Sequence, residues 1–123
     1  LTLGEENWTI FSGMDEQSLF GAMVGTRANI GSTLNLMPGV YRKIREHYES
    51  GDLASANELQ IRANRITLVL QDFGFGGALR EAMRILGFDC GEPRLPVTPL
   101  PAESCQAFHE ALAAVDFGQL SAM

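Results

Sequence analysis

Hydrophobic positions along the chain fall first into two short runs and then into longer stripes with helical spacing. Residues 8–12 are rich in β-branched and aromatic side chains, and residues 28–30 form a second, weaker run, so each run is predicted to be a strand. Between them, an apolar face that ends at Gly25 predicts a helix with Asp15 as its N-cap. That face consists of Leu19, Phe20, Ala22 and Met23.

Helical patterns continue through the middle of the chain. Pro38 suits the first turn of one predicted helix and Gly51 ends it. Asp52 is the predicted N-cap of a longer helix, whose apolar positions recur every three or four residues. These positions are Leu53, Ala56, Leu59, Ala63, Ile66, Leu70 and Phe73.

The C-terminal third contains two more predicted helices and a proline-rich segment. A break at residues 74–77 separates a shorter helix, which ends at Gly87. Four prolines between residues 92 and 101 exclude a helix there and favour an extended segment. A last helix is predicted over residues 102–112, and residues 118–123 are expected to fray.

The resulting order, β-α-β-α-α-α-α, is typical of a piece of a larger α/β protein. The crossover predicts that residues 8–12 and about 28–32 are adjacent parallel strands, with helices over more than half of the chain. Parallel sheets are stable when they are covered on both faces and extended on both sides, which two strands cannot achieve. We therefore expect a fragment whose true start lies upstream, with a strand edge that is bare or completed by another chain.

Composition excludes some classes of partner. The chain has 46% hydrophobic and 20% charged residues, with 9 basic against 15 acidic side chains, and it has no basic run suited to nucleic acid. No apolar run approaches the ~20 residues that span a bilayer, so no membrane partner is expected. The two cysteines, Cys90 and Cys105, lack metal-ligand spacing, so no metal is expected. Such a low number of cysteines also fits a reducing cytoplasm.

Polar clusters follow both predicted strands. Residues 13–16, Gly-Met-Asp-Glu, follow the first strand, and residues 31–35, Gly-Ser-Thr-Leu-Asn, follow the second. In α/β barrels such loops build the active site, and their carboxylates and hydroxyls suit a polyhydroxylated ligand. The alternatives are that Asp15 is only a helix cap, that Glu16 is a first-turn acid, and that Gly31-Ser32-Thr33 is a turn.

The two clusters resemble the seventh and eighth strands of the N-acetylneuraminate lyases. These enzymes belong, with dihydrodipicolinate synthase, to the pyruvate-dependent class I aldolases. The similarity continues through residues 49–53, 76–82 and 90–96, and it covers about residues 8–112. It therefore matches only the last third or so of such an enzyme. One departure is Leu34, where the lyases often have an aromatic residue.

The resemblance implies the C-terminal portion of a (β/α)8 TIM barrel followed by additional C-terminal helices. Residues 1–50 would be the last two βα units, and residues 51–123 the helical extension. Gly13, Asp15, Glu16 and Ser32 would bind the hydroxylated tail of a sugar acid. The resemblance also implies pyruvate as the other small-molecule partner, a cytoplasmic homo-oligomer (a tetramer), and binding to the remainder of the barrel.

The covalent chemistry is expected outside this chain. In the family, a lysine on the sixth strand forms an imine with pyruvate, so no separate cofactor is expected. The single lysine here, Lys43, lies between Arg42 and Arg45 with Glu46 and Glu49 close by, which predicts a solvated helix face. We therefore expect no catalytic residue in this chain, which alone would be inactive.

Three alternatives remain open at this point. One is a sibling enzyme, either of the dihydrodipicolinate synthase type or a sugar-acid dehydratase. Another is a barrel that binds a substrate phosphate at Gly31 and Ser32, which the neighbouring Asp15 and Glu16 would oppose by charge repulsion. The third is a non-enzymatic helical interaction module, whose two strands would join a partner's sheet.

Overall fold

The computed structural model describes residues 8–123, and its first part is a short parallel sheet. Strand β1 (Phe11–Ser12) pairs in parallel with β2 (Ala28–Asn29), with Phe11 opposite Ala28. The Ile30 amide donates to the Ser12 carbonyl at 2.9 Å just beyond the ladder. The predicted parallel adjacency is therefore confirmed, although the strands are shorter than predicted.

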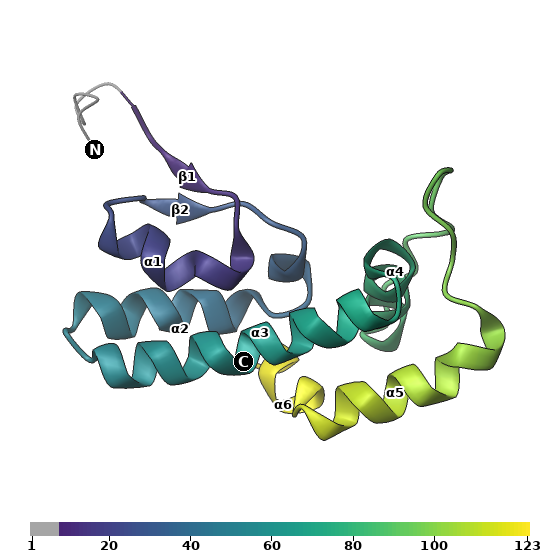
Figure 1. The fold of residues 1–123 in the computed structure, drawn as a ribbon. Coiled ribbons are helices and arrows are strands. Elements are labelled where there is room, and N and C mark those ends of the chain that lie inside the picture. The colour runs from purple at the N-terminus through teal and green to yellow at the C-terminus, as the bar shows by residue number, and fades with distance from the viewer. Residues whose placement is uncertain (1–7) are drawn as a thin grey trace.

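The crossover between the strands places α1 (Ser18–Met23) beneath the sheet (Figure 1). Leu19 and Ala22 are buried, whereas Phe20 is 68% exposed and Met23 is 52% exposed. Only half of the predicted apolar face is therefore buried, because α1 packs on the other helices through its Leu19 side. Phe11 of β1 is exposed as well. Apolar surface therefore remains uncovered beside the sheet, at Phe11, Phe20 and Met23.

The remaining elements are helical, so that α-helices account for more than half of the chain. Their bounds are η1 (Asp15–Gln17), η2 (Thr33–Asn35), α2 (Pro38–Glu49), α3 (Leu53–Asp72), α4 (Phe75–Ile85), η3 (Ala102–Ser104), α5 (Cys105–Ala114) and α6 (Phe117–Ser121). Within residues 8–123, no helix is both long and apolar enough to cross a membrane.

Helices α2 and α3 lie side by side and together carry nearly half of the buried core residues (Figure 1). The turn between them has Gly51 at φ +84°, and the Asp52 carboxylate accepts from the Ser55 amide at 3.1 Å, as expected of an N-cap. The predicted stripe on α3 is buried except at its ends, where Leu53 is 49% exposed and Phe73 is partly buried. The core therefore includes residues of every helix from α1 to α6.

Helix α4 begins earlier than predicted. Only Phe73 and Gly74 separate α3 from α4, with Gly74 at φ +86°, and Gly76 and Gly77 lie inside α4. A Cβ on Gly77 would lie 2.6 Å from the Leu100 amide nitrogen and 2.7 Å from the Thr98 carbonyl oxygen. These glycines therefore allow the chain from residue 88 to 101 to pass close to the helix, rather than breaking it.

The C-terminus is ordered, contrary to the expected fraying. Residues 117–121 form α6, an additional helix, in which Phe117 and Leu120 are buried. Met123 packs so closely on α2 that a Cβ on Gly39 would overlap its backbone. The contact with α2 explains the difference, because the local sequence gives no sign of such a distant partner.

Candidate functional site

The loops that follow β1 and β2 are joined by one buried carboxylate. The Asp15 Oδ2 atom accepts from the Thr33 amide at 2.8 Å and from the Thr33 hydroxyl at 2.7 Å. Asp15 is only 6% exposed, and its Oδ1 atom has no hydrogen-bond partner among the described residues. The structure thus brings the two predicted clusters together at the carboxyl ends of the parallel strands.

Asp15 is not the helix cap that its sequence position predicted. The residue that precedes η1 is Met14, and no side chain caps this turn. The Asp15 carboxylate instead faces the second loop, so closely that a Cβ on Gly31 would overlap it. Gly31 is therefore required by close packing, and the cap interpretation is wrong because the better donors come from the neighbouring loop.

A tyrosine of α2 extends this hydrogen-bonded group. The Tyr41 hydroxyl lies 2.7 Å from the Thr33 hydroxyl, and both side chains are buried. Burial raises the pKa of Tyr41 well above its usual range, and the charge of Asp15 acts in the same direction. Because Thr33 donates to Asp15, neutral Tyr41 supplies the donor to Thr33, and the order is Tyr41 to Thr33 to Asp15.

Helix α3 holds the first loop from below. The Gln60 side chain donates to the Asp15 carbonyl at 3.0 Å and accepts from the Leu19 amide at 2.9 Å. The Asn64 amide group donates to the Glu16 carbonyl at 3.1 Å. These polar residues satisfy backbone groups that would otherwise be buried without partners, so α3 fixes the loop conformation.

The other predicted site residues are more accessible than Asp15. Gly13 is exposed, with open space where a side chain would stand. Glu16 is half-buried, and its Oε1 atom lies 3.5 Å from the side-chain amide nitrogen of Gln71. Ser32 is exposed. A ligand could therefore reach Gly13, Glu16 and Ser32 directly, whereas Asp15 mainly supports the loops that carry them.

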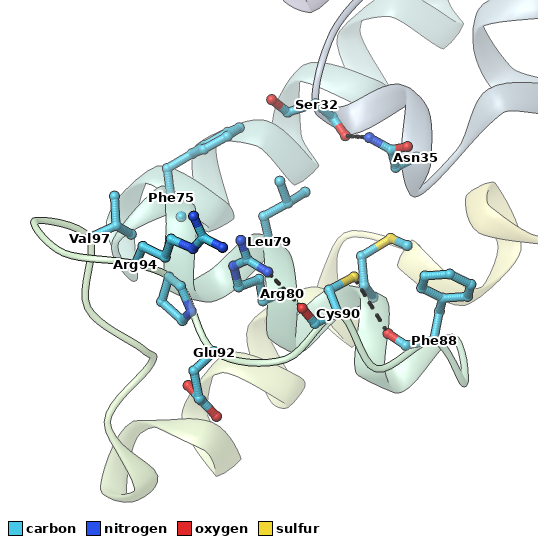
Figure 2. Close-up of a pocket in the computed structure, with 13 residues that line it drawn as sticks. Ser32, Asn35, Phe75, Leu79, Arg80, Phe88, Cys90, Glu92, Arg94 and Val97 are labelled. Atoms are coloured by element: carbon cyan, nitrogen blue, oxygen red, sulfur yellow. Dashed lines mark hydrogen bonds between the residues drawn. The ribbon is translucent and has the colours of Figure 1, made fainter.

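A cavity of about 890 Å³ opens beside the second loop (Figure 2). Ser32 and Asn35 lie on one side, and α4 and the chain from residue 88 to 97 form the other walls. Gly13, Asp15 and Glu16 do not line it, so only one of the four predicted residues does. The further residues at the cavity are Phe75, Gly76, Leu79, Arg80, Met83, Phe88, Cys90, Glu92, Pro93, Arg94 and Val97.

Lys43 lies away from this cavity. It is half-buried on α2, between the ion pairs Arg42–Glu46 and Arg45–Glu49, which are 3.7 Å and 3.8 Å long. Neither described cavity has Lys43 in its lining. In residues 8–123 there is also no cluster of three histidine, cysteine or acidic side chains that could hold a metal ion.

Comparison with known proteins decides the family. The family model described as the dihydrodipicolinate synthetase family matches residues 2–115. The chain belongs to this family. Its relatives include a 4-hydroxy-tetrahydrodipicolinate synthase from Caldicellulosiruptor bescii, 32% identical over 109 residues, which cover 89% of this chain and 36% of the relative. An N-acetylneuraminate lyase from Mus musculus is 30% identical over 115 residues, 92% of this chain and 36% of the relative.

The fold is shared with solved structures. A structure described as KD(P)GA from T. tenax superposes with a TM-score of 0.83 at 27% identity, covering 94% of this chain and 41% of that one. The chain thus spans little more than a third of the length of the relatives that it matches. A mostly helical chain with two parallel strands and this coverage is consistent with part of an aldolase barrel.

Proposed function

We propose that the chain is the C-terminal part of a Schiff-base lyase that cleaves N-acetylneuraminate or a related sugar acid to pyruvate and an aldose. The supporting observation is the Asp15–Thr33 link, which holds the ends of two parallel strands together and leaves Gly13 and Ser32 open. Family membership supports the aldolase class, and relatives such as the mouse protein are named as lyases.

In this proposal, residues 1–50 are the last two βα units of the barrel, and residues 51–123 extend it. Gly13, Glu16 and Ser32 contact the hydroxylated tail of the substrate, and Asp15 contributes to binding by holding the two loops that carry them. The lysine that forms the pyruvate imine lies in the remainder of the barrel, so this chain alone is inactive. The whole protein is proposed to be a cytoplasmic homo-oligomer, a tetramer.

A second candidate is an enzyme of the synthase type. The 32% identity to the Caldicellulosiruptor synthase is slightly higher than the 30% identity to the mouse lyase. Both candidates use pyruvate, and they differ in the aldehyde partner. The residues that distinguish them are therefore those that face the aldehyde end of the substrate, among which we place Glu16 and Ser32.

The test uses the full-length protein and measures pyruvate release from N-acetylneuraminate and related sugar acids. Replacing Glu16 by Gln removes a charged acceptor, and each hydrogen bond of this kind is worth about 1.5–3 kcal/mol. We expect kcat/KM to fall roughly 10- to 100-fold for Glu16→Gln and less for Ser32→Ala. Asp72→Asn, an exposed change at the end of α3, is the control and should leave activity unchanged.

Two outcomes would contradict the proposal. Full cleavage activity in both Glu16→Gln and Ser32→Ala would show that these loops do not contact the substrate. Absence of cleavage of every sugar acid by the wild-type protein, together with condensation of pyruvate with another aldehyde, would favour the synthase-type candidate.

A further inference from the structure

A stripe of polar side chains runs along α3 on the side that meets the first strand-end loop. Gln60, Asn64, Thr67 and Gln71 recur every three or four residues, so they share one face of the helix. Gln60 is only 6% exposed and Thr67 only 2% exposed, while Asn64 is half-buried. Helix α3 and η1 are in contact. Because a buried polar group is costly unless it is hydrogen-bonded, the partners of this stripe show what it holds.

The side-chain amides of Gln60 and Asn64 have one possible orientation. The Leu19 backbone amide, which can only donate, contacts Gln60 Oε1 at 2.9 Å. Gln60 Nε2 therefore donates, to the Asp15 carbonyl at 3.0 Å and to Asn64 Oδ1 at 2.8 Å. Asn64 Nδ2 in turn donates to the Glu16 carbonyl at 3.1 Å. The two side chains thus connect α3 to backbone groups of the first loop and of the start of α1.

Glu16 depends on Asn64 for its position. It is the middle residue of η1, which spans only Asp15–Gln17 and has no side-chain cap. A single turn of 3-10 helix has poor hydrogen-bond geometry, so it fixes its residues weakly by itself. The bond from Asn64 holds the Glu16 backbone, and Gln71 Nε2 lies 3.5 Å from Glu16 Oε1. The direction in which the Glu16 carboxylate points is therefore set from α3.

The second loop is held by different bonds. Ser32 precedes Thr33, whose amide and hydroxyl both donate to Asp15. Neither of these bonds involves Asn64. A change at Asn64 therefore acts on Glu16 and leaves the bonds beside Ser32 in place.

We propose that Asn64, supported by Gln60, is a positioning residue that directs the Glu16 carboxylate toward the hydroxylated tail of the sugar acid. The inference rests on the proposed function and assigns a role in substrate specificity to α3, the first helix of the C-terminal extension. Neither Asn64 nor Gln60 lines either described cavity, so both act through the loop and not by contact with the ligand. A small misplacement of a substrate-contacting group is costly, because the contact depends on its position.

The experiment is a double-mutant cycle in the full-length enzyme, with N-acetylneuraminate as substrate and pyruvate release as the signal. Asn64→Leu keeps the approximate volume of the side chain and removes its donor, and it is introduced into the wild type and into Glu16→Ala. We expect it to lower kcat/KM about 3- to 10-fold in the wild type. In Glu16→Ala, where no carboxylate remains to be positioned, the loss should be less than about twofold. Asn57→Leu, the same change at an exposed position of α3, is the control and should have no effect in either background.

Two further measurements separate positioning from a general loss of structure. Borohydride trapping of the pyruvate adduct reports the fraction of enzyme with an intact imine site, and this fraction should be unchanged in Asn64→Leu. Asn64→Asp keeps the acceptor for Gln60 Nε2 but has no donor for the Glu16 carbonyl, so it should also lower kcat/KM in the wild type and not in Glu16→Ala. Equal losses in the two backgrounds, or a matching loss of the pyruvate adduct, would overturn the proposal.

Failure of this inference can be told from failure of the proposed function. If Glu16→Ala lowers kcat/KM but Asn64→Leu has no effect, or has the same effect in both backgrounds, only the positioning role is wrong. If the wild type forms no pyruvate adduct, or if Glu16→Ala cleaves the sugar acid as well as the wild type does, the proposed function is wrong and the positioning role is refuted with it.

Discussion

Replacing Asp15 by Ala should destabilise the protein as well as the site. Asp15 Oδ2 is the acceptor for both the amide and the hydroxyl of Thr33, and all of these groups are buried. Removal of the carboxylate leaves two donors without an acceptor in a place that water reaches poorly. The change therefore affects the link between the two loops before it affects any ligand.

The magnitude follows from the number of donors left unpaired. A buried donor without a partner costs about 1–3 kcal/mol, so two donors would cost about 2–6 kcal/mol. The Tyr41 hydroxyl already donates to Thr33 across 2.7 Å, so this contact cannot accept the freed donor, and only relaxation of the two loops recovers part of the loss. We expect a net destabilisation of about 2–4 kcal/mol for Asp15→Ala and about half of that for Asp15→Asn, which keeps one acceptor oxygen.

The assay is thermal unfolding of the full-length protein, followed by circular dichroism. At roughly 2–4 °C per kcal/mol for a domain larger than about 150 residues, the Tm of Asp15→Ala should fall by roughly 4–16 °C. The matched control is Asp72→Ala, because Asp72 is exposed and its loss should change stability by less than about 0.5 kcal/mol. A Tm for Asp15→Ala equal to that of Asp72→Ala would refute the structural role of this carboxylate.

Three further predictions concern the helical extension and the isolated chain. Glu81 accepts from His109 and Arg84, and the hydrogen bond with His109 lowers its pKa below the ordinary 4.5. Its contribution to stability is therefore present above about pH 4.5 and is lost as the pH falls through the lower folded-state pKa. The difference in urea midpoint between wild type and Glu81→Gln should shrink in acid. A difference that stays constant with pH would show that the pairing is absent. Gly77→Ala should lower the Tm, at a cost of about 1–3 kcal/mol, because backbone atoms block the new methyl group. Gly76→Ala should cost less, because its methyl group meets the movable Val97 side chain. Equal losses in the two variants would contradict the close packing. Residues 1–123 expressed alone should aggregate, because the sheet exposes apolar surface, and light scattering measures this. A soluble monomer that unfolds cooperatively would instead favour the interaction-module alternative.

Local sequence signals predicted the fold wherever the structure is decided locally. Pro38, Gly51 and Asp52 mark helix ends through their own backbone preferences, and the structure confirms each of them. The exposure of Phe20 could not be predicted, because the choice of the buried face of α1 depends on helices far along the chain. The order of residues 117–121 depends in the same way on contacts of the C-terminus with α2.

The candidate site was predictable in its location but not in its hydrogen bonding. The spacing of the two strand-end clusters placed them at one edge of the sheet, and the structure agrees. Thr33, the partner of Asp15, lies 18 positions away, so a local cap interpretation was equally consistent with the sequence. The cavity beside Ser32 could not be predicted, because only the path of the extended segment across α4 brings its walls together.

We propose that this chain provides the aldehyde side of a pyruvate-dependent site whose lysine lies elsewhere in the protein. The most direct test is to reduce the full-length protein with borohydride in the presence of pyruvate and to locate the adduct by peptide mass spectrometry. We expect one modified lysine, in a peptide upstream of these 123 residues. A modified Lys43, or no adduct at all in a protein that remains folded, would contradict it.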